Sequence, residues 1–160
     1  MAVDIQPGDE VITTPFSFIA TTEVVSLLGA IPVFVDVDNS GNLDPLKLKS
    51  FINKKTKAII VVHLHGNMAK INKIKLISKK IPIIEDCAQS FGSSLNKKKA
   101  GTYGSIACFS FYPTKNLSAI GDGGAIITNN KNLYNRMISL RQYGWNKKRI
   151  SERLGFNSRL

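Results

Sequence analysis

Short apolar segments alternate with amphipathic segments along the chain, and this alternation constrains the fold more than any other feature. The expected strands cover residues 9–14, 31–37, 57–62, 81–85, 106–112 and 124–128. The expected helices cover residues 19–28, 45–53, 70–80 and 132–143. Strands and helices that alternate in this way form crossover units, whose strands run parallel. The sequence therefore predicts an α/β fold with three layers (α/β/α) around a mostly parallel sheet.

Several local patterns sharpen this prediction. Strand 31–37 is almost continuously apolar, and we expect it to be covered on both faces. Asp44 and Pro45 are a capping residue and a first-position proline for the helix that follows them. Residues 91–94 and 101–104 flank a basic turn, which indicates a hairpin loop. The helices should face the core with these apolar side chains: Val24, Val25, Leu27, Leu28, Leu46, Leu48, Phe51, Ile52, Ile71, Ile74, Leu76 and Ile77.

Size and composition indicate one globular domain. The chain has 160 residues, of which 43% are hydrophobic and 21% charged. Its formal net charge of +11 comes from lysines scattered over the outer faces of helices, so we do not expect nucleic-acid binding. There is no apolar run of about 20 residues and no signal-like start, which predicts no membrane span and a cytoplasmic protein. Cys87 and Cys108 lie in apolar contexts and are expected to be reduced, buried thiols.

One lysine follows directly on an apolar strand. Pro113 ends strand 106–112, and Lys115 comes next, in a loop that runs toward Gly121, Gly123 and Gly124. A partly desolvated amine loses its proton more readily, and the neutral amine is the nucleophile that forms a Schiff base with an aldehyde. The alternative is an ordinary lysine that extends from the loop into solvent.

An acidic residue at the end of an earlier strand favours the interpretation of Lys115 as a lysine that forms a Schiff base. Asp86 follows strand 81–85, and ligands of parallel sheets bind beyond the carboxyl ends of the strands. A lysine that holds an aldehyde and a carboxylate that keeps a pyridine nitrogen protonated are the two groups that pyridoxal phosphate requires. Ser110 lies on the strand before the lysine, where its hydroxyl can contact a phosphate. These three residue types predict a site for pyridoxal 5'-phosphate.

Two histidines offer a competing interpretation. His63 and His65 stand on either side of the end of strand 57–62. A metal site would need a third ligand nearby, and the sequence indicates none. We therefore expect histidines whose hydrogen bonds are satisfied within the protein, and no metal.

Five segments in order carry a family resemblance: VITTPFSFIATTEVVSLLGAIPVFVDVD, VVHLHGN, IIEDCAQSFG, FSFYPTKNLSAIGDGGAIIT and GFNSRL. With them the sequence resembles the DegT/DnrJ/EryC1/StrS family of sugar aminotransferases, which are fold-type-I pyridoxal phosphate enzymes. The resemblance implies that Lys115 forms the covalent link to the cofactor and that Asp86 binds its pyridine nitrogen. It also implies that Gln89 lies near the ring hydroxyl and that Ser110 contacts the phosphate.

Two further roles follow from the resemblance. Phe18 corresponds to an aromatic residue that stacks on the cofactor, although Phe16 and Phe18 would also fit a core. Asn157 corresponds to an asparagine that reaches the phosphate in the neighbouring subunit, which implies a homodimer. The structural alternatives are that Gln89 caps the following turn and that Asn157 is an ordinary turn residue.

The resemblance implies that an amino group moves from L-glutamate to a nucleotide-linked keto sugar, in the biosynthesis of sugars such as cell-surface polysaccharides. The family's glycine-threonine phosphate motif and its C-terminal small domain are missing from residues 1–160, so we expect a partial large domain. An inactive fragment or a regulatory scaffold remains an alternative. A sugar dehydratase is another, but those relatives have histidine where this chain has Lys115, which favours amino transfer.

Overall fold

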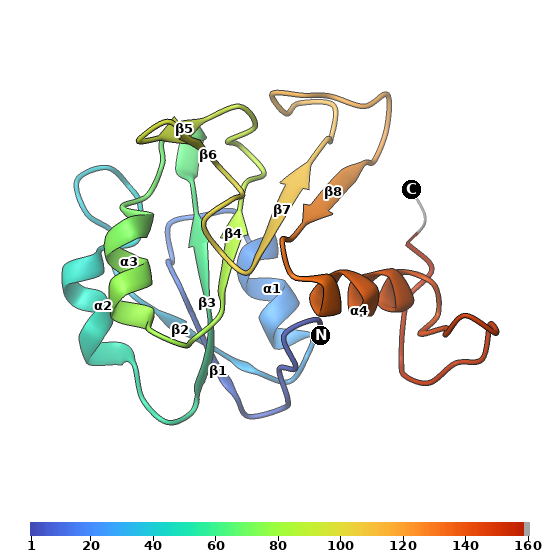
Figure 1. The fold of residues 1–160 in the computed structure, drawn as a ribbon. Helices are drawn as coiled ribbons and strands as arrows, with labels where there is room; N and C mark the ends of the chain where they lie inside the picture. Colours follow the sequence, from blue (N-terminus) through green and yellow to red (C-terminus); the bar gives the residue numbers. More distant parts are fainter. Residues whose placement is uncertain (159–160) are drawn as a thin grey trace.

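The computed structural model describes residues 1–158 and contains a mixed sheet in the order β2-β1-β3-β4-β7-β8 (Figure 1). Neighbouring strands are parallel except for β8, which runs antiparallel to β7. The strands of this sheet are β1 (Glu10–Thr13), β2 (Ile31–Phe34), β3 (Thr56–Val62), β4 (Ile83–Asp86), β7 (Ile106–Ser110) and β8 (Gly124–Ile127). The helices are α1 (Ala20–Ser26), α2 (Pro45–Phe51), the 3-10 turn η1 (Leu64–Gly66), α3 (Ile71–Ser78) and α4 (Lys131–Arg141). The predicted α/β class is confirmed.

The local signals read from the sequence act as expected. The carboxylate of Asp44 accepts a hydrogen bond of 2.9 Å from the backbone N–H of Leu46 and so caps α2, whose first residue is Pro45. The basic turn forms a hairpin of β5 (Ser94–Leu95) and β6 (Lys98–Lys99). Its two turn residues, Asn96 and Lys97, have positive φ angles of 51° and 64°, as a tight two-residue hairpin loop requires.

The two faces of the sheet pack against different helices. The alternation of side chains along each strand decides which residue faces which helix layer. On one face Val11, Ala58 and Ile60 pack with Val25 of α1. On the other face the core is formed with α2 and α3 by Ile12, Ile59, Val61, Leu48, Ile71 and Ile74. Successive strand residues point to opposite faces. In β4, Ile84 packs on the α1 side and Ile83 on the α2/α3 side, so the next two residues, Glu85 and Asp86, also diverge.

Two burial predictions are wrong. Strand β2 is an edge strand with β1 as its neighbour, and its Ile31 and Phe34 are 48% and 44% exposed rather than covered on both faces. Only part of each predicted apolar helix face reaches the core, because a helix turns by about 100° per residue and adjacent residues cannot all face inward. The predicted core side chains that are exposed instead are Val24, Leu27, Leu46, Phe51 and Leu76.

The strand directions place three loops at one edge of the sheet. Strands β1, β4 and β7 belong to its parallel part, so their carboxyl ends meet at the same edge. The loops that leave this edge are residues 14–19, 87–93 and 111–123. This is the edge where open α/β sheets bind ligands. In the described part of the chain, no helix has the length and apolar character needed to cross a membrane.

Candidate active site

Asp86 lies at the carboxyl end of β4 and is half-buried on the α1 side of the sheet. One oxygen, Oδ2, accepts a hydrogen bond of 2.8 Å from the Thr21 hydroxyl, and the other, Oδ1, accepts one of 3.1 Å from the Ala88 N–H. Among the described residues, the Asp86 side chain forms no ion pair. Its charge is therefore oriented by the protein but left for a cationic group of a ligand.

The adjacent strand brings Ser110 and Lys115 to the same edge. Cys108 of β7 pairs in register with Asp86 of β4, and Ser110 lies two residues further along β7, so it faces the same side of the sheet as Asp86. Lys115 follows in the loop 111–123 and is half-buried. Its backbone N–H donates to Tyr112 O at 2.8 Å, and the Ser118 hydroxyl donates to its carbonyl at 2.8 Å. The backbone of Lys115 is therefore held on both sides.

Phe18 lies in the loop that joins β1 to α1, at this same edge. Its side chain is 74% exposed and that of Phe16 is 58% exposed, so the interpretation of both as core residues is wrong. The backbone N–H of Thr21 donates to Phe18 O at 3.2 Å, which places Phe18 one turn before the residue that contacts Asp86. An exposed ring at this position is free to stack on a ligand.

Gln89 connects two loops. Its side-chain oxygen accepts a hydrogen bond of 2.9 Å from the backbone N–H of His65 in η1. The amide nitrogen of Gln89 retains donors for another partner. The side chain thus holds η1, an earlier segment of the chain and not the turn that follows Gln89, and this contact is compatible with the predicted contact to a cofactor.

Asn157 is not brought to this edge. It pairs with Gln142 in an isolated antiparallel bridge just after α4. The segment beyond α4 lies on the β8 side of the molecule, away from β4 (Figure 1). Residues 159 and 160, which end the GFNSRL segment, lie outside the described residues. The role of Asn157 toward a neighbouring subunit stays a prediction.

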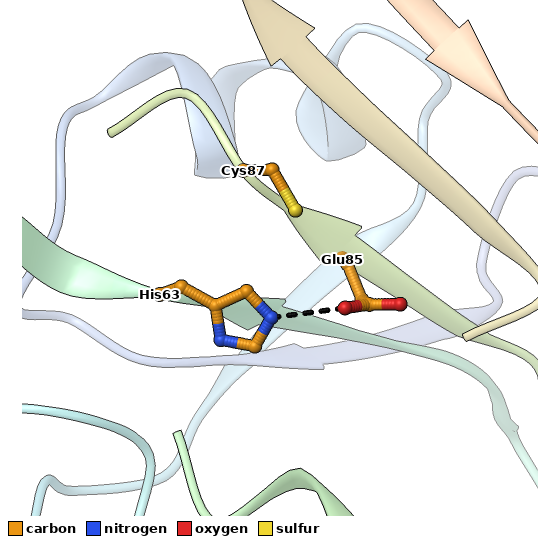
Figure 2. Close-up of side chains that lie close together, drawn as sticks. All are labelled: His63, Glu85 and Cys87. Atoms are coloured by element: carbon orange, nitrogen blue, oxygen red, sulfur yellow. Dashed lines mark hydrogen bonds and ion pairs between the residues drawn. The ribbon is translucent and has the colours of Figure 1, made fainter. Parts of the chain in front are cut away.

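His63 belongs to a buried cluster with Glu85 and Cys87 (Figure 2). Because successive strand residues point to opposite faces, Glu85 lies on the other side of the sheet from Asp86. The Nδ1 atom of His63 accepts from the Ala69 N–H at 3.2 Å, so in the neutral ring the proton is on Nε2, which lies 3.0 Å from Glu85 Oε2. Neither ring nitrogen is left with a free lone pair for a metal. The prediction that His63 is satisfied within the protein is confirmed.

Glu85 is the residue whose importance the sequence did not reveal. Its carboxylate is fully buried and accepts hydrogen bonds from the backbone N–H groups of Gly101 (2.9 Å), Tyr103 (2.7 Å) and Gly104 (2.6 Å) in addition to His63. Burial taken alone raises the pKa of Glu85, but the bonds from His63 and these three N–H groups outweigh it and hold the pKa below its ordinary value. The GTYG segment, with two glycines in four residues, is the sequence signal for this backbone cradle.

Gly104→Ala is expected to destabilise the protein by about 1–3 kcal/mol. An added Cβ would lie 2.6 Å from Ile83 O and 3.3 Å from Glu85 Cγ, so the cradle would have to open. Urea denaturation measures the effect. Gly121→Ala is the matched control, because a Cβ there meets nothing within 4 Å, and it should leave the midpoint nearly unchanged. Equal midpoints for the two variants would contradict the tight fit at Gly104.

Gly124 has a structural reason to be glycine. A Cβ at this position would lie 2.8 Å from the carbonyl oxygen of Phe109, on the strand that Gly124 joins by antiparallel pairing. The pairing of β7 with β8 therefore explains why this residue is glycine.

The two cysteines are free, as predicted. Burial raises the pKa of Cys87 to about 12 and that of Cys108 to about 11, so both are thiols rather than thiolates at neutral pH. Neither is suited to act as a nucleophile.

Comparison with known proteins identifies the family of the chain. Residues 1–160 match the DegT/DnrJ/EryC1/StrS aminotransferase family. The chain belongs to this family. A curated member from Pseudomonas aeruginosa, UDP-2-acetamido-2-deoxy-3-oxo-D-glucuronate aminotransferase, is 47% identical over 163 aligned positions, and the match covers 100% of this chain and 45% of the relative.

Solved structures of related proteins share the fold described above. S. venezuelae DesV, in complex with a ketimine intermediate, matches with a TM-score of 0.94 at 40% identity and covers 99% of this chain and 44% of its own. NtdA from Bacillus subtilis, with bound cofactor PMP, matches with a TM-score of 0.89 at 35% identity, over 98% of this chain and 36% of its own. The fold-type-I prediction is thus confirmed, and the chain spans less than half the length of each of these relatives.

Proposed function

We propose that residues 1–160 form part of the cofactor-binding large domain of a pyridoxal phosphate-dependent aminotransferase. Its reaction would transfer the amino group of L-glutamate to a nucleotide-linked keto sugar. The observation that carries the proposal is the carboxylate of Asp86, which has no cation partner among the described residues. It lies on the same face and edge of the sheet as Ser110, and Ser110 comes just before the Lys115 loop. Family membership and the nucleotide-sugar aminotransferase from Pseudomonas aeruginosa support it.

The residues at this edge fit the chemical groups of pyridoxal phosphate. Each Asp86 oxygen accepts one protein hydrogen bond and keeps a lone pair, and a protonated pyridine nitrogen offers both the donor and the opposite charge. The Lys115 amine matches the aldehyde and the Ser110 hydroxyl matches the phosphate. Phe18 supplies an exposed ring for stacking, and Gln89 has unused amide donors for the ring hydroxyl.

When bound, this cofactor supplies an electron sink for the carbon that exchanges its proton. The protein supplies the remaining functions. Lys115 Nζ would anchor the aldehyde of the cofactor until the amino donor displaces it. The freed amine would then accept a proton from the carbon of the amino donor and return it to the carbon of the cofactor. Asp86 keeps the ring nitrogen protonated, because a negative charge next to that nitrogen stabilises its charged form.

The proposal extends to the assembled protein. A homodimer would bring Asn157 to the cofactor phosphate of the partner subunit, and the reaction would take place in the cytoplasm, in the biosynthesis of sugars such as cell-surface polysaccharides. Asn157 pairs with Gln142 just after α4, in the segment that lies away from β4 (Figure 1), and this agrees with a contact outside its own subunit.

Addition of pyridoxal 5'-phosphate to the protein tests the proposal. We expect a new visible absorbance band, which decreases when L-glutamate is added while 2-oxoglutarate is released. A protein that gives no band with the cofactor would be a scaffold of the same fold, and the proposal would be wrong. A band that does not respond to glutamate would leave cofactor binding intact and exclude glutamate as the donor.

Asp86→Asn is expected to slow turnover by about 10²–10⁴-fold while part of the cofactor affinity remains. An amide has nearly the same shape as the carboxylate but carries no charge to stabilise the protonated ring nitrogen. Single-turnover rates with L-glutamate measure the effect. Glu23→Gln, an exposed acid on α1, is the matched control and should react at the normal rate. A normal rate for Asp86→Asn would refute the role assigned to Asp86.

A further inference from the structure

The contact between Thr21 and Asp86 joins two segments that are 65 residues apart in the chain. Thr21 is only 7% exposed, in the first turn of α1, and its hydroxyl donates to Asp86 Oδ2 at 2.8 Å. The other oxygen, Oδ1, is held locally by the N–H of Ala88, two residues further along the chain. The orientation of the carboxylate is therefore set by two bonds, and only the bond from Thr21 comes from another element.

A second hydroxyl supports the first. Ser17 Oγ lies 3.2 Å from Thr21 Oγ1. An ionised carboxylate only accepts hydrogen bonds, and a hydroxyl has a single proton to donate. Because the Thr21 proton is directed to Asp86, the proton between the two hydroxyls must come from Ser17. The resulting chain runs from Ser17 to Thr21 to Asp86, and such chains strengthen each member by polarisation.

The same loop also carries Phe18, which follows Ser17 directly. The Thr21 N–H donates to the carbonyl of Phe18 at 3.2 Å, so Thr21 holds the backbone of Phe18 with its own backbone and the carboxylate of Asp86 with its side chain. One residue thus connects the segment that carries Phe18 to the carboxylate of Asp86.

We propose that Thr21 is a positioning residue for Asp86, with Ser17 as its support, and that it sets how strongly the protein binds and protonates the pyridine ring of the cofactor. This inference rests on the proposed function, because it assumes that Asp86 meets a pyridine nitrogen. The Thr21 hydroxyl contacts Asp86 and Ser17. Its effect reaches the ligand through the orientation and the charge of the carboxylate.

Two substitutions separate this role from simple packing. Thr21→Val keeps the shape of the side chain and removes the hydroxyl, whereas Thr21→Ser keeps the hydroxyl and removes a methyl group. The full-length protein is titrated with pyridoxal 5'-phosphate, and the pH dependence of its visible spectrum is recorded. Thermal melting without cofactor gives the stability of each variant.

Thr21→Val is expected to weaken the affinity for pyridoxal phosphate about tenfold, equivalent to about 1.4 kcal/mol, as for a lost hydrogen bond to a charged group. The pH midpoint of the spectrum should rise by about one unit, since a less firmly protonated ring nitrogen withdraws less charge from the conjugated nitrogen that links Lys115 to the cofactor. Thr21→Ser should stay close to the wild type in both readouts. If Thr21→Val does not fold, Ser17→Ala should change both in the same direction by a smaller amount.

Two results would overturn the proposal. One is a Thr21→Val protein with wild-type affinity and midpoint, and the other is an equal loss in the valine and serine variants, which would indicate packing. A wild-type protein that binds no pyridoxal phosphate would refute the proposed function itself, together with this inference. If the wild-type protein binds pyridoxal phosphate and Thr21→Val has the same affinity and pH midpoint, only the inference about Thr21 would be refuted.

Discussion

Lys115→Ala is expected to abolish the visible absorbance that pyridoxal phosphate would acquire on the wild-type protein, and to reduce transamination by about 10⁴-fold or more. The amine would serve both as the covalent anchor and as the group that moves the proton, so one substitution removes both functions. The backbone of Lys115 is held by Tyr112 O and the Ser118 hydroxyl, so a change of side chain should leave the loop in place.

A second substitution separates the charge of Lys115 from its nucleophilicity. Lys115→Arg keeps a positive charge but cannot form the covalent link, and we expect it to behave like Lys115→Ala. Lys49→Ala on α2 is the control, because this lysine is exposed on the outer face of its helix and should not affect the spectrum. Borohydride reduction followed by peptide mass spectrometry should place the fixed cofactor on the peptide that contains Lys115. An unchanged spectrum in Lys115→Ala, or a cofactor fixed on another lysine, would refute the assignment.

Glu85→Gln is expected to reduce the free energy of unfolding by about 1–3 kcal/mol, the range for leaving a buried hydrogen-bond donor without its partner. The carboxylate is fully buried and accepts hydrogen bonds from His63 and three backbone N–H groups. A glutamine directs an N–H₂ group at some of these donors, so at least one buried donor loses its partner. Denaturant titration at neutral pH measures the loss.

A surface glutamate provides the control for this change. Glu10 Oε2 accepts a hydrogen bond of 2.7 Å from Asn53 Nδ2 near the surface, and Glu10→Gln should cost less than about 1 kcal/mol. If the two substitutions cost the same, the buried cradle does not contribute the stability assigned to it.

The pH dependence of stability gives an independent test of Glu85. Its pKa is lower in the folded protein than its ordinary value, so the folded state favours the ionised form. This contribution is fully present above the ordinary glutamate pKa and is lost as the pH falls below it, toward the lowered folded value. The wild type should therefore lose stability more steeply than Glu85→Gln in this acid range.

The spacing of apolar residues and the helix-capping residues explain why the order of strands and helices could be predicted. Aspartate before proline starts α2, and apolar runs of strand length mark the strands, because these signals act over a few residues. The exposed faces of Ile31 and Phe34 could not be predicted, because they depend on the position of β2 at the edge of the sheet. An apolar strand gives the same pattern whether its neighbours cover it or not.

The candidate site could also be predicted from the sequence only in part. Strand order predicts that Asp86 and Lys115 lie near one edge, since both follow the ends of parallel strands. The two acids Glu85 and Asp86 are adjacent, so alternation alone predicts that they point apart, but not which of them enters the core. Their partners decide this: His63 lies 22 residues before Glu85, and Thr21 lies 65 residues before Asp86.

From the amino-acid sequence alone came the class of fold, the approximate bounds of its strands and helices, and the residue types of a pyridoxal phosphate site, because short-range periodicity and motif order encode them. The tertiary structure alone decided that β2 is an edge strand, that Glu85 is bound inside the core, and that Thr21 holds Asp86. These features depend on contacts between segments distant in the chain, and no local pattern specifies such contacts.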